Sequence, residues 1–361
     1  MRIWFDCETS KEALLFPSIV SRLQGLGYDY LITCRDYDVA PSILSMSGLN
    51  YEVLGEHGGG SLKGKLLASA KRTRQLAECI TDLEKSKRPD LAVQIASPEA
   101  ARVAFGLAIP TVCINDTPHA KAQIRLVIPF SDYVILPEFI PRKPYARFVS
   151  DENIYQYEGI DAVEIFRYFT PDETVLSKLE LRRSQRIILY RPEEAFAAYY
   201  PLSGDSLPKG KAILKGLIKN FPSSQLVALP RYEEQRKVLE EEFSEQIIVP
   251  KGAIDTRSLE AFADLVLTGG STLAEEAAVQ GTPAISYFPK SLYRWKWLEE
   301  KGFPGFHIKD LQQAIKKMLQ ILENPNKYRK DTSAILDELQ SPGDVLIELL
   351  KEMNDKRSSE V

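Results

Sequence analysis

The chain has 361 residues, of which 44% are hydrophobic, so it is long enough to form two domains with separate cores. Its formal net charge of −4 and isoelectric point near 5.7 argue against general binding to nucleic acid or to an anionic membrane. Four widely spaced cysteines without a CxxC pair, and only three histidines, favour reduced thiols, so we expect no metal site and no cofactor.

The first fifteen residues, MRIWFDCETSKEALL, lack the pattern of a signal peptide. No apolar run approaches the roughly 20 residues that a membrane-spanning helix needs. We therefore expect a cytoplasmic protein, whose only membrane contact would be peripheral, at the inner face.

The first half of the chain alternates short apolar runs with longer amphipathic stretches, which predicts a parallel sheet covered by helices. A long helical stretch is expected at 64–86. The expected strands are 2–6, 29–34, 51–55, 91–96, 110–115 and 133–137.

The second half repeats this pattern after a segment, 137–166, that is rich in proline and aromatic residues and poor in periodicity. The crossover is expected near 155–180. One last amphipathic helix follows, for which a return to the first domain is one option, and then a charged, frayed end. The expected strands are 186–191, 224–231, 245–250, 263–269 and 283–289. The expected domains are 1–165 and 166–345, with 346–361 as the helix end and tail.

A glycine-rich loop, HGGG, follows the expected strand 51–55. Such a loop supplies amides to an esterase oxyanion hole, but the chain has no Gly-x-Ser-x-Gly elbow. The overlapping GGSLKGKL departs from a P-loop because Leu66 replaces the hydroxyl that holds magnesium. Contact with an acceptor or with phosphates remains open, as does a plain flexible turn. The residues concerned are His57, Gly58, Gly59 and Gly60.

Polar residues also follow other strands of the first half. Asp6 ends the first strand, and Asn115, Asp116 and His119 follow the fifth, so they are expected at one edge of the sheet. Asp116 or His119 would serve as a general base if burial brings its pKa towards the working pH. The alternative for His119 is a donor that stabilises the Thr-Pro turn.

The stretch LTGGSTLAEEAAVQGTP, residues 267–283, predicts a strand end, a tight turn, a helix and a second turn. Gly269 and Gly270 leave the backbone open to a phosphate, and Ser271 lies beside them. Thr272 and Glu275 match a capping box. Glu276, about 100° further round the helix, is then left to accept hydrogen bonds from ribose hydroxyls. The alternative for Glu276 is a solvated side chain at a helix start.

The longer segment ADLVLTGGSTLAEEAAVQGTPAISYFP resembles the nucleotide-binding segment of GT-B-fold glycosyltransferases, notably the peptidoglycan N-acetylglucosaminyl transferase. It also resembles that of the related non-hydrolysing UDP-N-acetylglucosamine 2-epimerases. A weaker likeness covers 100–137. With WFD, HGGG, RPEEAFAAYY and WKWLEEKG, the chain is similar along nearly its full length to a mostly archaeal family of GT-B-like proteins of unknown function.

This resemblance implies an α/β fold of GT-B architecture, with two Rossmann-like, doubly wound parallel-sheet domains facing a cleft. It implies that the C-terminal domain holds a nucleotide-diphosphate sugar, most simply of UDP type. In the resembled enzymes, a glutamate five residues before the Gly of Gly-x-Pro holds the uridine ribose, and here that glutamate is Glu276, with Gly281 and Pro283.

Two arginines of the second half lie at the carboxyl ends of strands: Arg191 follows RIILY (186–190) and Arg231 follows LVALP (226–230). Their guanidinium groups would bind phosphate oxygens and replace the divalent cation that GT-B enzymes generally do without. The alternative is that they form ion pairs with Glu193, Glu194 or Glu233.

The chain also departs from the resembled enzymes. The segment after its first strand, FDCETSKEALLF, contains no glycine, so the acceptor side differs from that of the transferases. The epimerases place acids where this chain has Ser97 and Asn115, which weakens the epimerase interpretation. The favoured activity is metal-independent glycosyl transfer. An epimerase-like isomerase and a non-catalytic nucleotide-sugar-binding protein remain as alternatives.

Two segments interleave aromatic and basic residues, FIPRKPYARF at 139–148 and LYRWKWL at 292–298. Such segments would suit a peripheral enzyme that contacts the membrane to act on a lipid-linked acceptor. The alternative is that the aromatic side chains pack into a domain interface.

Overall fold

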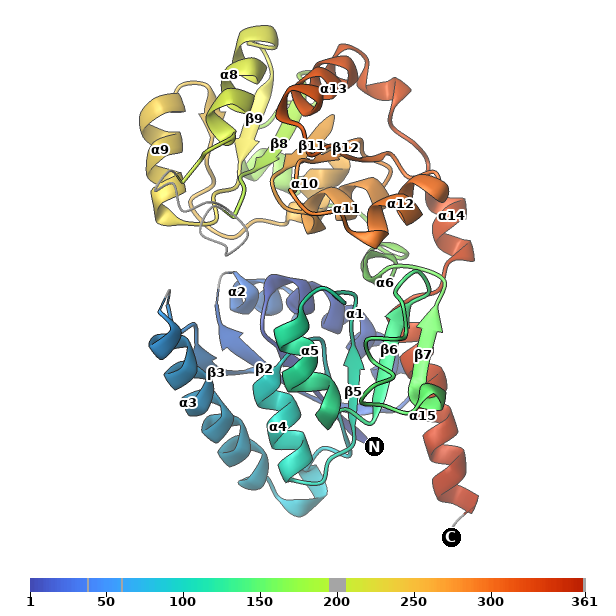
Figure 1. Cartoon of the computed structure of the whole chain (residues 1–361). Coiled ribbons are helices and arrows are strands. Elements are labelled where there is room, and N and C mark those ends of the chain that lie inside the picture. Colours follow the sequence, from blue (N-terminus) through green and yellow to red (C-terminus); the bar gives the residue numbers. More distant parts are fainter. Residues whose placement is uncertain (38, 60, 195–205, 360–361) are drawn as a thin grey trace. The chain divides into compact units, whose positions relative to one another are not determined.

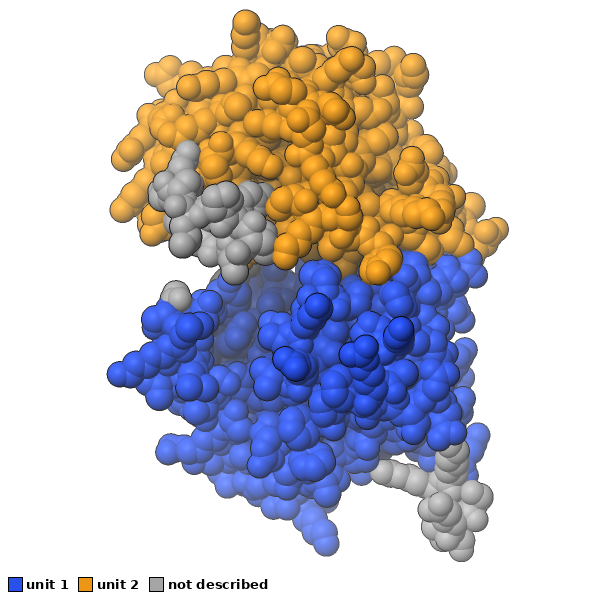
Figure 2. Space-filling view, viewed as in Figure 1, with its two compact units in different colours: residues 1–165, 339–361 blue, residues 166–338 orange. Residues whose placement is uncertain are grey.

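The computed structural model of the chain describes residues 1–37, 39–59, 61–194 and 206–359. It divides into two compact units, coloured separately in Figure 2. Unit 1 contains residues 1–165 and the chain from Leu339 onward, and unit 2 contains Phe166–Glu338.

Unit 1 contains a seven-stranded sheet in the order β3-β2-β1-β4-β5-β6-β7, in which every pairing is parallel (Figure 1). Because the strand order reverses at β1, the carboxyl ends of β1 and β4 lie where open α/β sheets bind their ligands. The strands are β1 (Arg2–Cys7), β2 (Asp29–Asp36), β3 (Glu52–Glu56), β4 (Leu91–Gln94), β5 (Thr111–Ile114), β6 (Tyr133–Pro137) and β7 (Ile154–Tyr157).

Helices cover both faces of this sheet (Figure 1). Along one face α3, α4 and α5 lie in series, and α1 packs with α2 on the other, where α15 lies on β6 and β7. The central strands are therefore buried on both faces, which explains their continuous apolar sequences. The helices are α1 (Ser10–Gly25), α2 (Ala40–Met46), α3 (Leu62–Thr81), α4 (Pro98–Gly106), α5 (Lys121–Val127), α6 (Asp161–Phe166) and α15 (Pro342–Ser359).

Unit 2 contains a six-stranded sheet in the order β10-β9-β8-β11-β12-β13, again with parallel pairing throughout. Its strands are β8 (Ile187–Arg191), β9 (Gln225–Ala228), β10 (Ile247–Ile248), β11 (Leu265–Thr268), β12 (Ala284–Ser286) and β13 (Gly305–His307). Its helices are α7 (Thr174–Lys178), α8 (Gly210–Asn220), α9 (Glu233–Phe243), α10 (Thr256–Phe262), α11 (Thr272–Val279), α12 (Tyr293–Glu300), α13 (Leu311–Glu323) and α14 (Ser333–Glu338).

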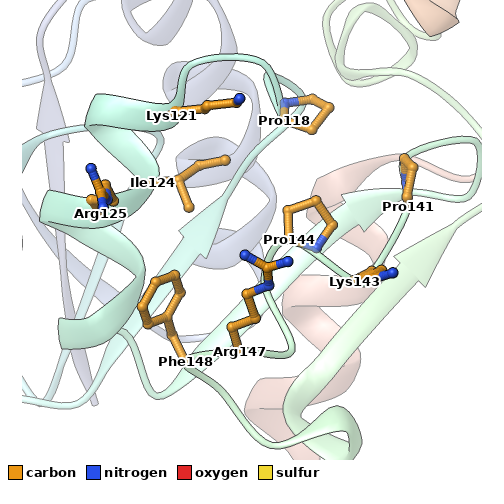
Figure 3. A pocket seen from close by; sticks show the side chains of 9 residues that line it. All are labelled: Pro118, Lys121, Ile124, Arg125, Pro141, Lys143, Pro144, Arg147 and Phe148. Carbon is orange, nitrogen blue, oxygen red and sulfur yellow. The ribbon is translucent and has the colours of Figure 1, made fainter.

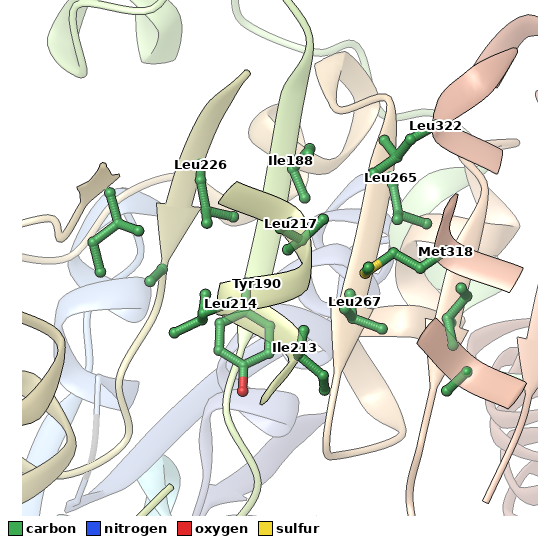
Figure 4. Close-up of a cluster of buried hydrophobic side chains, with 14 of the residues drawn as sticks. Ile188, Tyr190, Ile213, Leu214, Leu217, Leu226, Leu265, Leu267, Met318 and Leu322 are labelled. Atoms are coloured by element: carbon green, nitrogen blue, oxygen red, sulfur yellow. The ribbon is translucent and has the colours of Figure 1, made fainter. Parts of the chain in front are cut away.

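The core of unit 2 lies between its sheet and the helices α8 and α13 (Figure 4). Leu214 and Leu217 of α8, and Met318 of α13, pack on strand residues such as Ile188 and Leu267. This packing fixes the strands whose carboxyl ends carry the candidate nucleotide site.

The structure confirms the predicted α/β fold with two parallel sheets, and it adds elements that the sequence did not suggest. The segment predicted to lack periodicity contains β7, and unit 2 ends its sheet with β13, only three residues long. The last helix begins at Pro342 and lies with unit 1, so the expected boundary at 345 falls inside α15. Arg22 of α1 pairs with Asp344 at the start of α15, with 2.5 Å between Nη2 and Oδ1.

Within the described residues, no helix combines the length and the apolar character needed to cross a membrane. The same part of the chain contains no group of three or more His, Cys, Asp or Glu side chains that would hold a metal ion.

Candidate functional site

The carboxyl ends of four strands of unit 2 lie side by side. In the register of the sheet, Thr268 of β11 pairs with Arg191 of β8 on one side and with Ser286 of β12 on the other, and Ser286 pairs with His307 of β13. Residues that follow these strands therefore meet at one edge of the sheet, as predicted for the stretch after β11.

The start of α11 differs from the prediction. The helix begins at Thr272, so Ser271 and not Thr272 is the N-cap residue, and no side chain caps the helix. Ser271 has helical backbone angles, φ −114° and ψ −47°, and these do not place its hydroxyl on the next amides. The predicted capping box of Thr272 and Glu275 is therefore wrong.

Glu275 instead forms a buried ion pair with a helix further along the chain. Its carboxylate Oε2 accepts a hydrogen bond of 2.5 Å from Nη1 of Arg294 in α12, and both side chains are less than a tenth exposed. The sequence offered no signal for this pair, because its partners lie nineteen residues apart on different helices. Glu275 thus has a structural role, although a different one from that predicted.

The N-terminus of α11 is therefore not capped by a side chain. The Ser271 hydroxyl and the backbone of Gly270 lie beside it. The Ser271 Oγ is buried and has no hydrogen-bond partner among the described residues. The Gly270 N–H donates to Thr268 Oγ1 at 3.0 Å, and Gly270 O accepts from Ser286 Oγ at 2.5 Å. These bonds fix the turn before the helix.

Arg231 lies directly over this turn. A Cβ atom added at Gly270 would come within 2.8 Å of Arg231 Nη2, so the guanidinium occupies the space that a side chain would take. Its Nε donates to the carbonyl of Pro192 at 3.2 Å, and within the described residues it forms no ion pair. The alternative of an ion pair with Glu193, Glu194 or Glu233 is not what the structure shows for this arginine.

Glu193 is engaged elsewhere and is fully buried. Its Oε2 accepts from the Tyr287 hydroxyl at 2.6 Å, and its Oε1 accepts from the backbone N–H of Lys209 at 2.7 Å, just before α8. The Glu193 backbone also explains why residue 269 is a glycine, because a Cβ atom at Gly269 would lie only 2.5 Å from Glu193 Cα. Gly269 therefore allows this close packing of the β8 loop, a use of the glycine that we did not predict.

Glu276 lies on the buried side of α11, with 5% of its surface exposed, and so it is not the solvated side chain of the alternative. Its charge acts on Glu260 of α10, which is fully buried. Burial, followed by the charge of Glu276, raises the pKa of the Glu260 carboxyl well above its ordinary value, while Arg191 acts in the opposite direction. Glu260 Oε2 accepts from Gln280 Nε2 at 3.0 Å.

In unit 1, Asp6 forms the centre of a buried ion pair that the sequence did not reveal. Arg72 of α3 donates to both carboxylate oxygens, at 2.7 and 3.0 Å, and both side chains are about 1% exposed. Thr33 Oγ1 donates to the same carboxylate at 2.5 Å. The only signal was that Arg72 lies at the helical spacing of Leu76 and Ile80, on the buried face of α3. This arrangement makes Asp6 a structural residue, enclosed within unit 1.

The residues after β5 divide between the interior and the surface. Asn115 is buried; its amide donates to the Ile95 carbonyl at 3.2 Å and accepts from the Tyr145 hydroxyl at 2.7 Å. Asp116 lies 2.8 Å from Nζ of Lys11, which also pairs with Asp161. His119 is exposed, in the turn before α5.

The loop after β3 contributes to a pocket of about 300 Å³ at the carboxyl edge of the unit 1 sheet. His57 stacks on Tyr37 with ring centroids 4.5 Å apart, and burial, with Arg35 and Lys65, lowers the pKa of His57. Gly58, Arg35 and Lys65 also line the pocket. Gly59 has φ +74°, a conformation that favours glycine, and Gly60 lies outside the described residues.

Two carboxylates that we did not predict, Glu8 and Glu99, line the same pocket. Arg72 Nη1 lies 3.6 Å from Glu8 Oε1 and 4.0 Å from Glu99 Oε2. Burial raises the pKa of Glu8 well above its ordinary value; Arg35 opposes this and Glu99 adds to it. Glu8 directly follows β1 and Glu99 is the second residue of α4, and both are usual places for polar site residues in such sheets.

The two aromatic and basic segments differ in exposure. In 292–298, Trp295 and Trp297 are buried within unit 2 and Arg294 pairs with Glu275, whereas Tyr293 is 56% exposed. In 139–148, Tyr145 is buried but Phe148 is 44% exposed.

Sequence comparisons identify the family of this chain and one of its relatives. The family model described as "Protein of unknown function (DUF354)" matches residues 1–355. The uncharacterized protein MJ0665 of Methanocaldococcus jannaschii is 30% identical over 319 residues, which cover 87% of this chain and 89% of that protein.

Solved structures share the fold at low sequence identity. The UDP-GlcNAc 2-epimerase of Neisseria meningitidis, bound to UDP-GlcNAc, superposes with a TM-score of 0.72 and 15% identity over 98% of this chain and 100% of its own. The M. jannaschii UDP-GlcNAc 2-epimerase, in complex with UDP-GlcNAc and UDP, has a TM-score of 0.68, 16% identity and the same coverage. Anabaena Alr3699/HepE, in complex with UDP and glucose, has a TM-score of 0.59 and 17% identity over 99% of this chain and 100% of its own.

Proposed function

The chain belongs to the DUF354 family, whose function is unknown, and we propose that it binds a nucleotide-diphosphate sugar. The proposed site is the carboxyl edge of the unit 2 sheet, around the start of α11. Unit 2 is then the nucleotide-binding domain, and unit 1 is the acceptor-side domain.

The observation that carries this proposal is the pairing of Arg231 with the uncapped start of α11. The first amides of a helix have no partners within the helix, and they bind anions such as phosphate. Here no side chain caps them, the Ser271 hydroxyl has no partner among the described residues, and the Arg231 guanidinium lies over Gly270 without a carboxylate. An arginine fork beside helix amides is suited to a diphosphate.

The roles of the remaining residues follow from this placement. Gly270, Ser271 and Thr272 present the phosphate-binding backbone, with Gly269 holding the turn in place. Glu276, on the same helix, is proposed to accept the ribose hydroxyls. Arg191, at the end of β8, is proposed to face the phosphates from the neighbouring strand. The solved structures of the same fold hold UDP or UDP-GlcNAc, which supports a UDP-type ligand.

The activity we favour is metal-independent glycosyl transfer, with Asp116 or His119 as the base that takes the acceptor proton. Two observations support this choice over an epimerase. Ser97, at a position where the epimerases carry an acid, caps α4 by accepting from the Ala100 amide at 3.1 Å, and the Asn115 side chain is held by Ile95 and Tyr145. Neither side chain supplies an acid or a base. A non-catalytic nucleotide-sugar-binding protein remains the second candidate.

A thermal-shift panel of UDP, GDP, CDP and dTDP, each with its sugar conjugates, tests the binding. A ligand at 100 times its dissociation constant stabilises the folded state by about 2.7 kcal/mol, which gives a clear shift in melting temperature. Product analysis with the best ligand then separates the activities: a transferase consumes the donor only when an acceptor is present, an epimerase changes the sugar alone, and a binding protein does neither. No shift with any compound would contradict the proposal.

A further inference from the structure

Unit 1 carries a second pocket, separate from the one at His57. It has a volume of about 580 Å³, which falls within the roughly 300–1,000 Å³ of ligand pockets, and it lies between α5 and the segment 141–148 that follows β6 (Figure 3). We call it the cationic pocket, because its lining contains Lys121, Arg125, Lys143 and Arg147.

The floor of the cationic pocket is apolar. Ile124 of α5 and Phe148 line it, and Pro144 lies between the two cationic sides (Figure 3). Beneath the segment, Tyr145 is fully buried and hydrogen-bonded to Asn115, so the backbone that carries Lys143 and Arg147 is anchored to the core. Phe148 is 44% exposed. A preformed apolar surface is therefore bordered by fixed positive charge.

The four cations are not explained by the fold. None of them forms an ion pair within the described residues, and no carboxylate lines the pocket. The nearby Arg142, in contrast, is paired with Asp151 at 3.0 Å. Four uncompensated positive charges on one pocket are unusual in a chain whose net charge is −4. They repel one another, and a bound anion would remove that repulsion.

We propose that the cationic pocket holds the headgroup of an anionic phospholipid and the first part of its hydrocarbon chain, so that unit 1 docks on an anionic membrane surface. The guanidinium and ammonium groups would bind the phosphate, and Ile124 and Phe148 would contact the chain. Neither half of this ligand alone matches the pocket, because an inorganic anion leaves the apolar floor uncovered and a neutral hydrocarbon leaves the cations unpaired. The proposal does not depend on nucleotide-sugar binding by unit 2.

Flotation of the whole chain with vesicles tests this directly. The parent protein should float with vesicles of phosphatidylcholine and phosphatidylglycerol but not with pure phosphatidylcholine, and added salt should reduce the binding. The double variant Lys143→Gln/Arg147→Gln should bind about 30-fold more weakly, which corresponds to about 2 kcal/mol at about 1 kcal/mol per cation. Phe148→Ser, which keeps all four charges, should also weaken the binding.

The matched control is the double variant Arg74→Gln/Lys85→Gln, which removes one arginine and one lysine from exposed positions elsewhere on unit 1. It should float like the parent, and all variants should keep the parent's melting temperature. Equal flotation of the two double variants would overturn the proposal, as would flotation of Phe148→Ser equal to that of the parent. Stabilisation of the protein by millimolar inorganic phosphate to the same degree as by the vesicles would also overturn it, because a soluble anion would then suffice.

Discussion

Glu275 and Glu276 are adjacent carboxylates with different surroundings. Glu275 forms a buried ion pair with Arg294, whereas the charge of Glu276 raises the pKa of another carboxyl, that of Glu260. The sequence suggested that Glu275 is structural and that Glu276 is available to a ligand. The structure supports the first half of that division for a different reason, because an ion pair replaces the predicted cap.

The ion pair changes the expected cost of losing Glu275. Glu275→Ala would remove the carboxylate that pairs with the buried Arg294 guanidinium, so we expect a loss of about 3–5 kcal/mol in the free energy of unfolding. Loss of a cap would cost only about 1 kcal/mol. Urea denaturation measures the difference. The control is Glu275→Gln/Arg294→Met, which removes both charges and should lose less; a loss near the cap value for Glu275→Ala would contradict the ion-pair role.

Glu276→Ala should show the opposite pattern. The charge of Glu276 raises the pKa of the buried Glu260 carboxyl, so its removal relieves a repulsion, and we expect the melting temperature of the unliganded protein to fall less than for Glu275→Ala. Loss of two charge-assisted hydrogen bonds to a ribose should weaken nucleotide binding by roughly 2–4 kcal/mol. Calorimetric titration with the best nucleotide decides the matter, and an affinity equal to that of the parent would exclude the ribose role.

The raised pKa of the buried Glu8 predicts that the stability of the protein depends on pH. Burial raises its folded-state pKa well above the ordinary 4.5, so the folded chain holds this proton more tightly than the unfolded chain. The parent therefore loses stability as the pH rises from about 4.5 through the folded-state pKa. Glu8→Gln removes this loss, so the variant should gain on the parent between pH 4 and pH 8. Glu56→Gln, at an exposed residue of the same pocket, is the control. If the stability of Glu8→Gln relative to the parent is the same at pH 4 and pH 8, the pKa of Glu8 is not raised and the prediction is wrong.

At the scale of elements, the turn before α11 depends on the absence of a side chain at Gly270. Gly270 has no side chain, and the Arg231 guanidinium occupies the space that a side chain would take, two residues before α11 begins. The glycine was predicted to admit a phosphate, and the structure shows that it first admits an arginine.

Gly270→Ala should therefore act through Arg231. The added Cβ would lie 2.8 Å from Nη2, so the guanidinium must move away from the helix start. Since one charge-assisted hydrogen bond contributes about 1.5–3 kcal/mol, we expect nucleotide affinity to fall by roughly 10- to 100-fold. Gly252→Ala, where a Cβ would meet nothing within 4 Å, is the control for titration. Equal affinities for the two variants would contradict this use of Gly270.

The elements that could be predicted from the sequence are those with a local signal. Central strands such as β1 and β11 are buried on both faces, so they appear as apolar runs bounded by polar residues. β13 has three residues, too few to show a period, and β7 lies in a proline-rich segment. In the site, Arg231 was predictable because it follows a strand. The Asp6 ion pair and the Glu275 ion pair were not, since each joins residues that only tertiary packing brings together.

At the scale of the whole molecule, the chain forms the sheet of unit 1, then the sheet of unit 2, and then a last helix that belongs to unit 1. The segment 166–338 builds one complete unit, and the last helix joins the first unit again through Arg22, Asp344 and Glu164. Arg22 bonds to both carboxylates, at 2.5 and 2.6 Å. Unit 1 therefore needs both ends of the chain, whereas the proposed nucleotide site lies within one continuous segment.

The most direct test of the central claim is a calorimetric titration of the whole chain with UDP and UDP-GlcNAc, for the parent, Arg231→Gln and Arg182→Gln. Arg182 is exposed before β8, at the opposite end of that strand from the site, and serves as the matched control. We expect saturable binding by the parent and by Arg182→Gln, and binding weaker by about 1.5–3 kcal/mol for Arg231→Gln. Absence of binding by the parent, or equal affinities for Arg231→Gln and Arg182→Gln, would contradict a diphosphate site at the start of α11.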